Sequence, residues 1–356
     1  MDLTDDLVSE FERIRPQYEA FTKSLHDLLT TLLTRLGIEY FAIEPRTKTV
    51  ASFSEKIQRE EKVGKYSQFS DVTDISGIRI IAYLQEDCDR ICQLLSSEFD
   101  IDEVNSVKKE EELDPDKFGY LSIHYVLSLG ENRSNLLEFS PYRSLKAEVQ
   151  IRTLLQHTWA AIDWKFRYKE EREAPKRLRR RLFRISALLE AADNEFSNVK
   201  NEIDEIRSEY SDSIKRGQLA IPINSESLLA FVSSSKEVKN IYSLVERAGL
   251  KLIDEEKQNV QNLLARLIGT SEILGITTLD QFESKLKEIQ PRCEEYFRIV
   301  VKEVKTVRQK SVARLYPLAL LRYSLFIGTT AKQREAINRK YKPAEGYAEA
   351  ISTASG

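Results

Sequence analysis

Apolar side chains in the first part of the chain follow helical spacing in some stretches and strand alternation in others. Residues 4–36 repeat apolar positions at helical spacing, from Leu7 to Leu36, which predicts one amphipathic helix. Pro16 lies inside this stretch, and we expect it to kink or divide the helix. Similar helical patterns over residues 51–66, 86–99 and 154–169 predict three shorter helices.

Three further stretches, residues 74–84, 121–130 and 145–153, are short and apolar or alternating, which predicts β-strands. Residues 37–50 predict an extended segment, and the polar, turn-rich residues 103–120 predict a loop. From residue 3 to 170 the order is helix, helix, strand, helix, strand, strand, helix. This order predicts an α+β fold with a mixed sheet and flanking helices.

The alternating pattern ends near residue 172. Residues 176–210 predict a long helix that packs through Leu178, Leu182 and Ile185, with a basic first half and an acidic second half. The rest of the chain to about residue 340 predicts helices throughout. We therefore expect a first domain over 1–172, a connecting helix over 173–216, an all-helical C-terminal domain over 217–342 that regulates or oligomerises, and a flexible tail over 343–356.

Composition narrows the class of protein. The chain has 356 residues, a formal charge of −3 and 41% hydrophobic residues, which predicts a soluble globular protein of about two domains. No apolar run is long enough to span a bilayer, and the first residues are acidic, so we expect a cytoplasmic protein without a membrane partner. The near-neutral charge argues against a protein that coats nucleic acid.

The cysteines and histidines argue against two kinds of metal site, a two-thiol zinc or redox site and a metal phosphohydrolase site. Cys88 and Cys92 lie one helical turn apart, but no second pair completes a zinc site, so we expect buried or half-exposed thiols. His26 and Asp27 form a lone His-Asp pair, whereas a metal phosphohydrolase needs several such ligands. With three histidines in all, the chain is not expected to carry such a hydrolase site.

Four stretches of the first domain carry polar side chains at positions where a strand or helix with a purely structural role would not require them. In "EPRTKTVASFSEK", Arg46, Lys48, Ser52 and Lys56 lie at the entry to a helix, where they could grip a polyphosphate or form a solvated basic face. In "DVTDISGIRIIAY", Asp74 precedes a strand that contains Arg79. Asp74 could hold Mg²⁺ or only initiate the turn.

The other two stretches are strands with a polar face. In "DKFGYLSIHY", Tyr120, Ser122 and His124 share one face after Lys117, and Tyr120 could stack on a base or fill the core. In "LKAEVQIRT", Glu148, Gln150 and Arg152 share one face, and Glu148 is a second carboxylate for a metal or for an attacking hydroxyl. Carboxylates, cations and a flat aromatic group together favour phosphoryl transfer.

These motifs, in this order and spacing over about residues 40–170, closely resemble the RelA/SpoT synthetase domain of the alarmone, or (p)ppGpp, synthetases. The resemblance implies a nucleotidyltransferase-like α/β domain. It also implies a Mg²⁺-dependent enzyme that moves the β,γ-pyrophosphate of ATP to the 3′-hydroxyl of GDP or GTP.

The resemblance also implies a role for each matching residue. On the ATP side, Arg46 would stack on the adenine, Lys48, Ser52 and Lys56 would hold the phosphates, and Asp74 would hold Mg²⁺ with Arg79 bonding nearby. On the acceptor side, Tyr120 would stack on the base, with Lys117, Ser122 and His124 beside it. Glu148 would be a metal ligand or the general base, and Gln150 would position the acceptor ribose.

Two departures leave the acceptor open. Phe118 stands where guanine-specific members carry Asn, and Trp164 stands where a His is common. The acceptor could therefore be an adenine nucleotide or the 3′ end of tRNA, as in toxin-type members. The basic residues 177–184 could contact such an RNA, although they are more typical of the polar face of a helix.

The helical half of the chain has no motif that resembles a known family. It could oligomerise the chain, inhibit the active site until a regulator binds, or serve as a scaffold. The chain could then be chiefly an interaction or sensor protein. We expect a homo-oligomer.

Overall fold

The computed structural model describes residues 3–58, 66, 69–108, 122–167, 176–253, 257–308, 313–342, 347, 350, 351 and 354. The chain divides into two compact units, Met1–Lys200 and Asn201–Gly356. Each unit has its own cluster of buried apolar side chains. Among the described helices, none combines the length and the apolar character that crossing a membrane requires.

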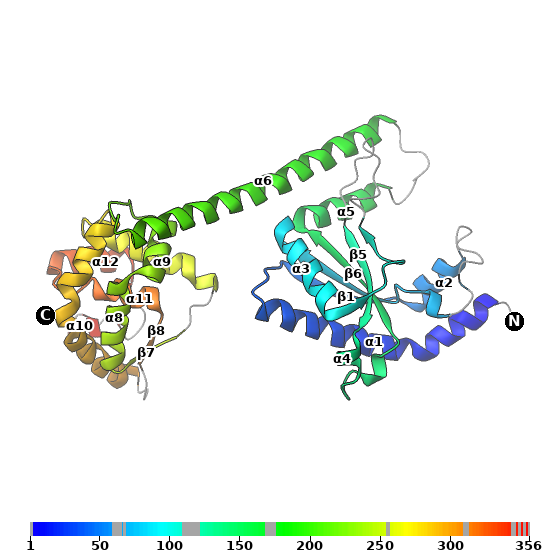
Figure 1. Ribbon diagram of the computed structural model, residues 1–356, viewed down its shortest axis with the longest axis horizontal. Helices are drawn as coiled ribbons and strands as arrows, with labels where there is room; N and C mark the ends of the chain where they lie inside the picture. Colours follow the sequence, from blue (N-terminus) through cyan, green and yellow to red (C-terminus); the bar gives the residue numbers. More distant parts are fainter. Residues whose placement is uncertain are drawn as a thin grey trace. The chain divides into compact units, whose positions relative to one another are not determined.

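The first unit is a mixed sheet with helices, as the sequence predicts (Figure 1). Its strands run in the order β1-β2-β6-β5-β3, and β4 pairs with β5. Only β2 and β6 are parallel; the other pairs are antiparallel. The strands are β1 (Ala42–Thr47), β2 (Ser76–Ala82), β3 (Phe99–Ile101), β4 (Val107–Lys108), β5 (Ile123–Leu129) and β6 (Lys146–Thr153).

The helices of this unit follow the predicted order with small changes at their ends. They are α1 (Leu3–Arg35), α2 (Val50–Gln58), α3 (Gln85–Glu98), the short α4 (Glu131–Ser134), α5 (Leu154–Arg167) and the first part of α6 (Lys176–Lys215). Pro16 lies inside α1 and does not divide it, contrary to one of the two expectations. The short strands β3 and β4 were not predicted.

Alternation along the strands gives the sheet one apolar and one polar face. In β6, Ala147, Val149 and Ile151 are buried, whereas Glu148 and Gln150 between them are partly exposed. The apolar face joins one core with α1 and α3, which supply large buried side chains such as Phe11 and Ile91. The core therefore covers the apolar face of the sheet, and the polar face carries the side chains that can form a binding site.

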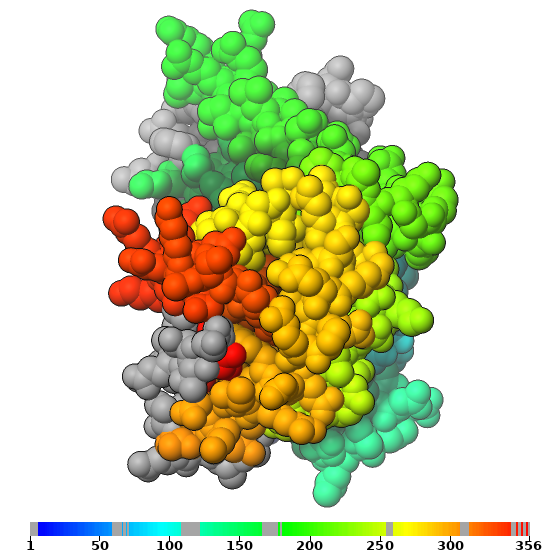
Figure 2. All heavy atoms as spheres, turned by 90° about the vertical axis from the view of Figure 1, so that its left-hand side faces the viewer, coloured from blue at the N-terminus to red at the C-terminus, as the bar shows by residue number. Residues whose placement is uncertain are grey.

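The second unit is helical, but it also contains two short parallel strands that the sequence did not predict. Its elements are α7 (Ser225–Ser234), α8 (Lys236–Arg247), β7 (Leu250–Leu252), α9 (Lys257–Ile273), α10 (Leu279–Arg308), β8 (Ala313–Leu315), α11 (Pro317–Ser324) and α12 (Ala331–Lys340). Helices α9, α10 and α12, coloured yellow, orange and red-orange, cover the face of this unit seen in Figure 2.

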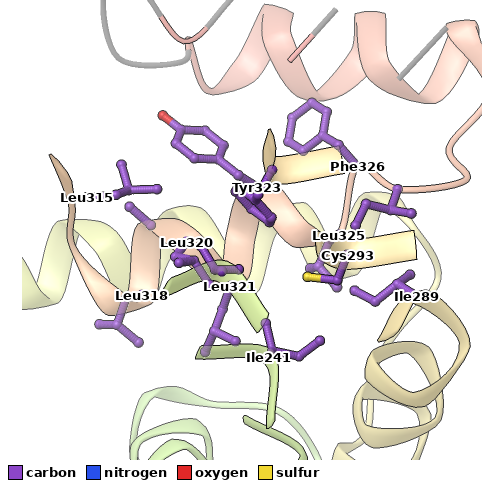
Figure 3. Close-up of a cluster of buried hydrophobic side chains, with 14 of the residues drawn as sticks. Ile241, Ile289, Cys293, Leu315, Leu318, Leu320, Leu321, Tyr323, Leu325 and Phe326 are labelled. Carbon is purple, nitrogen blue, oxygen red and sulfur yellow. The ribbon is translucent and has the colours of Figure 1, made fainter. Parts of the chain in front are cut away.

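The core of the second unit forms where α8, α10 and α11 meet. Ile241 of α8, Ile289 and Cys293 of α10 and Leu321 of α11 are buried in one cluster (Figure 3). The end of the chain also joins this cluster: Tyr347 is buried and stacks on Tyr323, with 5.6 Å between ring centroids. The described residues of the predicted flexible tail therefore include buried anchors.

Candidate active site

The strand register brings polar side chains from β1, β2, β5 and β6 onto one face of the sheet. Arg46, Gly77 and Glu148 lie in one row across β1, β2 and β6. Glu44, Arg79, Gln150 and His124 form the next row, which continues onto β5. Strand pairing thus joins motifs that lie up to a hundred residues apart in the sequence.

A cavity of about 450 Å³ opens on this face. Gly77 lies between Arg46 and Glu148 in the register, and its missing side chain leaves room between these two groups. The residues that line the cavity are Glu44, Pro45, Arg46, Lys48, Asp74, Gly77, Ile78, Arg79, Glu148 and Gln150. Both carboxylates of the predicted metal site, Asp74 and Glu148, therefore line one cavity.

Asp74 is held by two lysines from neighbouring elements. Lys48, just after β1, places its Nζ 3.2 Å from Oδ2, and Lys56 of α2 places its Nζ 2.7 Å from Oδ1. This buried oxygen has the ion pair to Lys56 but no hydrogen-bond partner. Burial alone would raise the pKa of Asp74, but Lys56 and Lys48 outweigh it, and the pKa lies below its ordinary value.

Glu148 accepts a hydrogen bond on each oxygen. His124 Nδ1 lies 2.9 Å from Oε1, and Gln150 Nε2 donates to Oε2 at 3.1 Å. Ser122 Oγ lies 2.6 Å from His124 Nε2 and extends the chain of hydrogen bonds. Burial favours a raised pKa for Glu148, but His124 and Gln150 lower it more than burial and the charge of Asp74 raise it.

Arg79 and Arg152 converge on Gln150 from two strands. Arg79 Nε donates to Gln150 Oε1 at 3.4 Å, its Nη1 donates to Glu44 at 3.0 Å, and Arg152 Nη2 donates to the same Gln150 oxygen. Arg152 is only 7% exposed, and its Nε has no hydrogen-bond partner. Burial, followed by repulsion from Arg79, lowers the pKa of Arg152 to about 10.

A second cavity of about 850 Å³ extends the site from the sheet to α2 and α5. Its lining includes the four residues predicted to bind ATP at the entry to α2, namely Arg46, Lys48, Ser52 and Lys56. Helix α5 contributes His157, Ala160, Ala161 and Trp164, which follow one another at the spacing of a single helix face. Trp164 is 64% exposed, so its ring is accessible from this cavity.

Asp74 and Glu148 fit a magnesium site in which the substrate supplies part of the ligand shell. Among the residues that the structure describes, no group of three or more His, Cys, Asp or Glu side chains could hold a metal. Mg²⁺ in phosphoryl-transfer sites takes one or two carboxylates, with water and substrate phosphates completing its shell. The donor set of Asp74 and Glu148, with the buried Oδ1 of Asp74, matches that requirement.

Comparison with known proteins identifies the domain that carries this site. Residues 45–173 match the family described as "Region found in RelA / SpoT proteins". These residues are a RelA/SpoT domain. The match begins at β1 and ends after α5, so it includes every sheet residue that lines the two cavities except Glu44.

Two relatives of the RelA/SpoT domain are GTP pyrophosphokinases of Bacillus subtilis (strain 168). YwaC is 27% identical in an alignment of 219 positions that covers 57% of this chain and 100% of YwaC. YjbM is 28% identical over 169 residues, which are 47% of this chain and 74% of YjbM. With the RelA/SpoT domain, they identify the chain as an enzyme of the pyrophosphokinase class.

Solved structures of similar proteins include small alarmone synthetases. Small alarmone synthetase 1 from Bacillus subtilis is 25% identical and covers 55% of this chain and 98% of its own, with a TM-score of 0.46. The same protein bound to its product pppGpp is 26% identical and covers 54% and 97%, with a TM-score of 0.45.

Ten of the twelve predicted site residues lie in the described part of the RelA/SpoT domain. Eight of them line one or both cavities: Arg46, Lys48, Ser52, Lys56, Asp74, Arg79, Glu148 and Gln150. Ser122 and His124 join them through the hydrogen bonds to Glu148. Lys117 and Tyr120, with Phe118, lie outside the described residues.

Several side chains that line the cavities were not among the predicted site residues, including the polar or aromatic Glu44, Arg152, His157 and Trp164. Strand alternation could have found two of them, because Glu44 shares a face with Arg46 and Arg152 shares a face with Gln150. His157 and Trp164 lie on α5 and reach the site only through the packing of that helix against the sheet.

Proposed function

We propose that the chain transfers the β,γ-pyrophosphate of ATP to the 3′-hydroxyl of GDP or GTP and so makes (p)ppGpp. The observation that carries this proposal is that Asp74 and Glu148 line one cavity with the cations Arg46, Lys48 and Arg79. The two named relatives are GTP pyrophosphokinases, and one similar structure holds pppGpp, which supports this choice of product.

The reaction exchanges one phosphorus–oxygen bond for another. The acceptor 3′-oxygen forms a bond to the β-phosphorus, the bond between that phosphorus and the α–β bridging oxygen breaks, and AMP leaves with that oxygen. ATP and GDP together carry roughly seven negative charges, so their approach requires cations to offset the repulsion. The basic groups around Asp74 meet this requirement.

On the ATP side, Lys48 and Lys56 release their ion pairs with Asp74 and form ion pairs with the phosphates of ATP. Both Nζ atoms already lie within 3.2 Å of Asp74, beside the cavity that contains Ser52. Arg46 stacks on the adenine, with Arg79 beside it. Mg²⁺, when bound by Asp74 and Glu148, neutralises the charge that develops on the transferred group.

On the acceptor side, Glu148 accepts the proton of the 3′-hydroxyl or orients that hydroxyl as a metal ligand. Each of its oxygens receives one hydrogen bond, which fixes the carboxylate and leaves lone pairs for the hydroxyl or the metal. Gln150 positions the ribose, while His124 and Ser122 lie beside the acceptor. Tyr120 and Lys117 complete the acceptor subsite in this proposal.

The proposal is tested by incubating the full chain with γ-³²P-labelled ATP and Mg²⁺ and one acceptor at a time. The acceptors are GDP, GTP, AMP, ADP, ATP and bulk tRNA, because Phe118 and Trp164 depart from the guanine-specific pattern. We expect labelled product with GDP or GTP and none with Glu148→Gln. Label on an adenine nucleotide acceptor or on tRNA would show that this molecule, and not GDP or GTP, is the acceptor. Labelled product that survives in Glu148→Gln, or no labelled product with any acceptor, would exclude this mechanism.

A further inference from the structure

Trp164 of α5 supplies a large flat ring to the second cavity. Ala160 and Ala161, which line the same cavity, lie four and three residues before it and therefore on the same face of the helix. Their side chains are single methyl groups, so they leave space beside the indole ring. Because Trp164 is 64% exposed, a ligand that covered the ring would remove a large apolar surface from water.

The two cavities place Trp164 on one side of the site. Both cavities are lined by Arg46, Lys48, Asp74 and Arg79. Among the described residues, Glu148 and Gln150 line the first cavity alone, whereas Ser52, Lys56 and Trp164 line the second alone. Trp164 therefore lies with the residues that we propose for ATP and not with those that we propose for the acceptor. The departure at position 164 thus bears on the nucleotide donor, although the sequence alone linked it to the acceptor.

The side chains of the second cavity fit the two ends of a nucleotide. Lys48 and Lys56 are cations that suit phosphates. Arg46 comes from β1 and Trp164 from α5, so two flat groups approach the same cavity from different elements. Guanidinium and indole planes both stack on nucleobases, because every base has a π face.

We propose that the indole ring of Trp164 stacks on the adenine of ATP, so that the base lies between Arg46 and Trp164. This inference rests on the proposed function for the identity of the donor and adds a residue that binds its base. Trp164 would take no part in the proton transfer or in the transfer of the pyrophosphate. Its loss should therefore weaken the binding of ATP more than it slows the chemical step.

Tryptophan fluorescence provides the first test. The chain has two tryptophans, and Trp159 is only 5% exposed, so a change of emission on contact with a base should come from Trp164. The full chain is titrated with Mg²⁺ and α,β-methylene-ATP, an analogue in which the bond that breaks is replaced. We expect saturable quenching in the wild type and none in Trp164→Phe, after correction with free tryptophan for absorption by the nucleotide. Quenching that survives in Trp164→Phe, or a bound analogue without quenching in the wild type, would overturn the proposal.

Calorimetry with ligands that have or lack a base provides the second test. We expect Trp164→Ala to weaken the binding of α,β-methylene-ATP by about tenfold or more, while Trp164→Phe keeps a stacking ring and loses less. Inorganic triphosphate has no base, so it should bind the wild type and Trp164→Ala equally. Phe41→Ala is the control, since Phe41 is an exposed ring of the first unit that lines neither cavity. Thermal unfolding checks that each variant keeps its fold.

These measurements separate the stacking of Trp164 from the proposed reaction, because binding of the analogue requires no turnover. Base-dependent binding through Trp164 without labelled product would exclude the reaction and leave the nucleotide site in place. Transfer to GDP with an unchanged KM for ATP in Trp164→Ala would exclude the stacking and leave the reaction in place. A variant that loses affinity for GDP and keeps its affinity for the analogue would put Trp164 on the acceptor side and overturn the proposal.

Discussion

At the scale of single residues, the environment of Glu148 distinguishes two roles that the carboxylate could have. A general base works best when its pKa is close to the working pH, whereas a metal ligand must remain ionised. His124 and Gln150 hold the pKa of Glu148 below its ordinary value despite burial. Within the proposed mechanism, this lowered pKa favours Glu148 as the residue that would hold the metal and orient the hydroxyl over Glu148 as the general base.

Substitutions on the two sides of the site should separate turnover from ATP binding. Glu148→Gln keeps the size of the side chain but removes its charge, so we expect turnover to fall below detection, by about 10⁴-fold, with a modest loss of ATP binding. Lys56→Ala removes a phosphate contact, so ATP binding should fall more than turnover. Single-turnover rates and calorimetry measure the two effects. Equal loss of turnover in both variants with intact binding would refute this division.

Two exposed positions provide matched controls for these variants. Glu138→Gln makes the same chemical change in the exposed segment after α4, and Lys23→Ala makes the same truncation on the exposed side of α1. Both should bind ATP and turn over like the wild type, because neither side chain lines a cavity among the described residues.

The ion pairs of Asp74 should make its contribution to stability depend on pH. Because the pKa of Asp74 is lower in the folded chain than its ordinary 3.8, the ionised form stabilises the fold above that value, and this contribution disappears as the pH falls through the folded pKa. Asp74→Asn leaves Lys48 and Lys56 facing each other without the carboxylate. We expect it to lower the free energy of unfolding of the first unit by about 1 kcal/mol at pH 7.

Denaturant unfolding at several pH values measures this difference. It should stay constant above about pH 5 and shrink as the carboxyl of the wild type becomes protonated below its ordinary pKa. Asp27→Asn is the control, since Asp27 is 64% exposed and lies far from the site in α1. A difference that grows toward low pH would contradict the depressed pKa.

At the scale of elements, β2 forms the floor of the cavity because Gly77 has no side chain there. A Cβ on Gly77 would lie 3.4 Å from the Arg46 carbonyl oxygen, an ordinary contact, and the backbone does not have a positive φ. A Cβ is therefore compatible with the strand, as in Ala, and the branched side chain of Val is a type that strands favour.

The series Gly77→Ala and Gly77→Val should reduce ATP binding in steps, because each added methyl group occupies the gap between Arg46 and Glu148. We expect the KM for ATP to rise at least tenfold in the Val variant while thermal unfolding changes little. The two substitutions serve as controls for each other, since a general folding defect would lower Tm in parallel with binding. Unchanged ATP binding in Gly77→Val would show that the nucleotide does not occupy this cavity.

The predicted elements differ from the observed ones where the chain has too few residues to show a period. Strand β6 was predictable because eight residues alternate and place Glu148 and Gln150 on one face. Strands β7 and β8 have three residues each and pair across about sixty residues of chain, so neither carries a local signal. Their pairing follows from the packing of α8 and α10.

At the scale of the whole molecule, the sequence predicted the site residues that belong to short motifs. It did not predict the residues that reach the site only through the packing of elements far apart in the chain. Asp74 and Glu148 come from separate motifs, and the parallel pairing of β2 with β6 brings these motifs side by side. Trp164 reaches the second cavity only because α5 packs beside the sheet. The sequence predicts that Leu178 and Ile185 pack α6 against the chain, yet both are about half exposed, because an apolar stripe at helical spacing does not show what covers it.

The two units have separate cores, so a defect in the second should leave the first folded. Gly269 lies inside α9, and a Cβ there would fall 2.0 Å from the hydroxyl oxygen of Tyr341, which must then move. Tyr341 in turn lies over Arg322, a buried cation whose Nη2 donates to the Tyr341 carbonyl. Gly269→Ala should therefore disturb a buried cation and its partners, although Ala is the better helix former.

Calorimetry should show two unfolding transitions for the wild type. We expect Gly269→Ala to lower the transition of the second unit by an amount that corresponds to about 1–3 kcal/mol, with the transition of the first unit and its ATP binding unchanged. Ala265→Ser, at an exposed position one turn earlier in α9, is the control and should change neither transition by much. If both transitions and ATP binding fell together in Gly269→Ala, the two cores would be one cooperative unit, and the helical half would be required for the fold of the site.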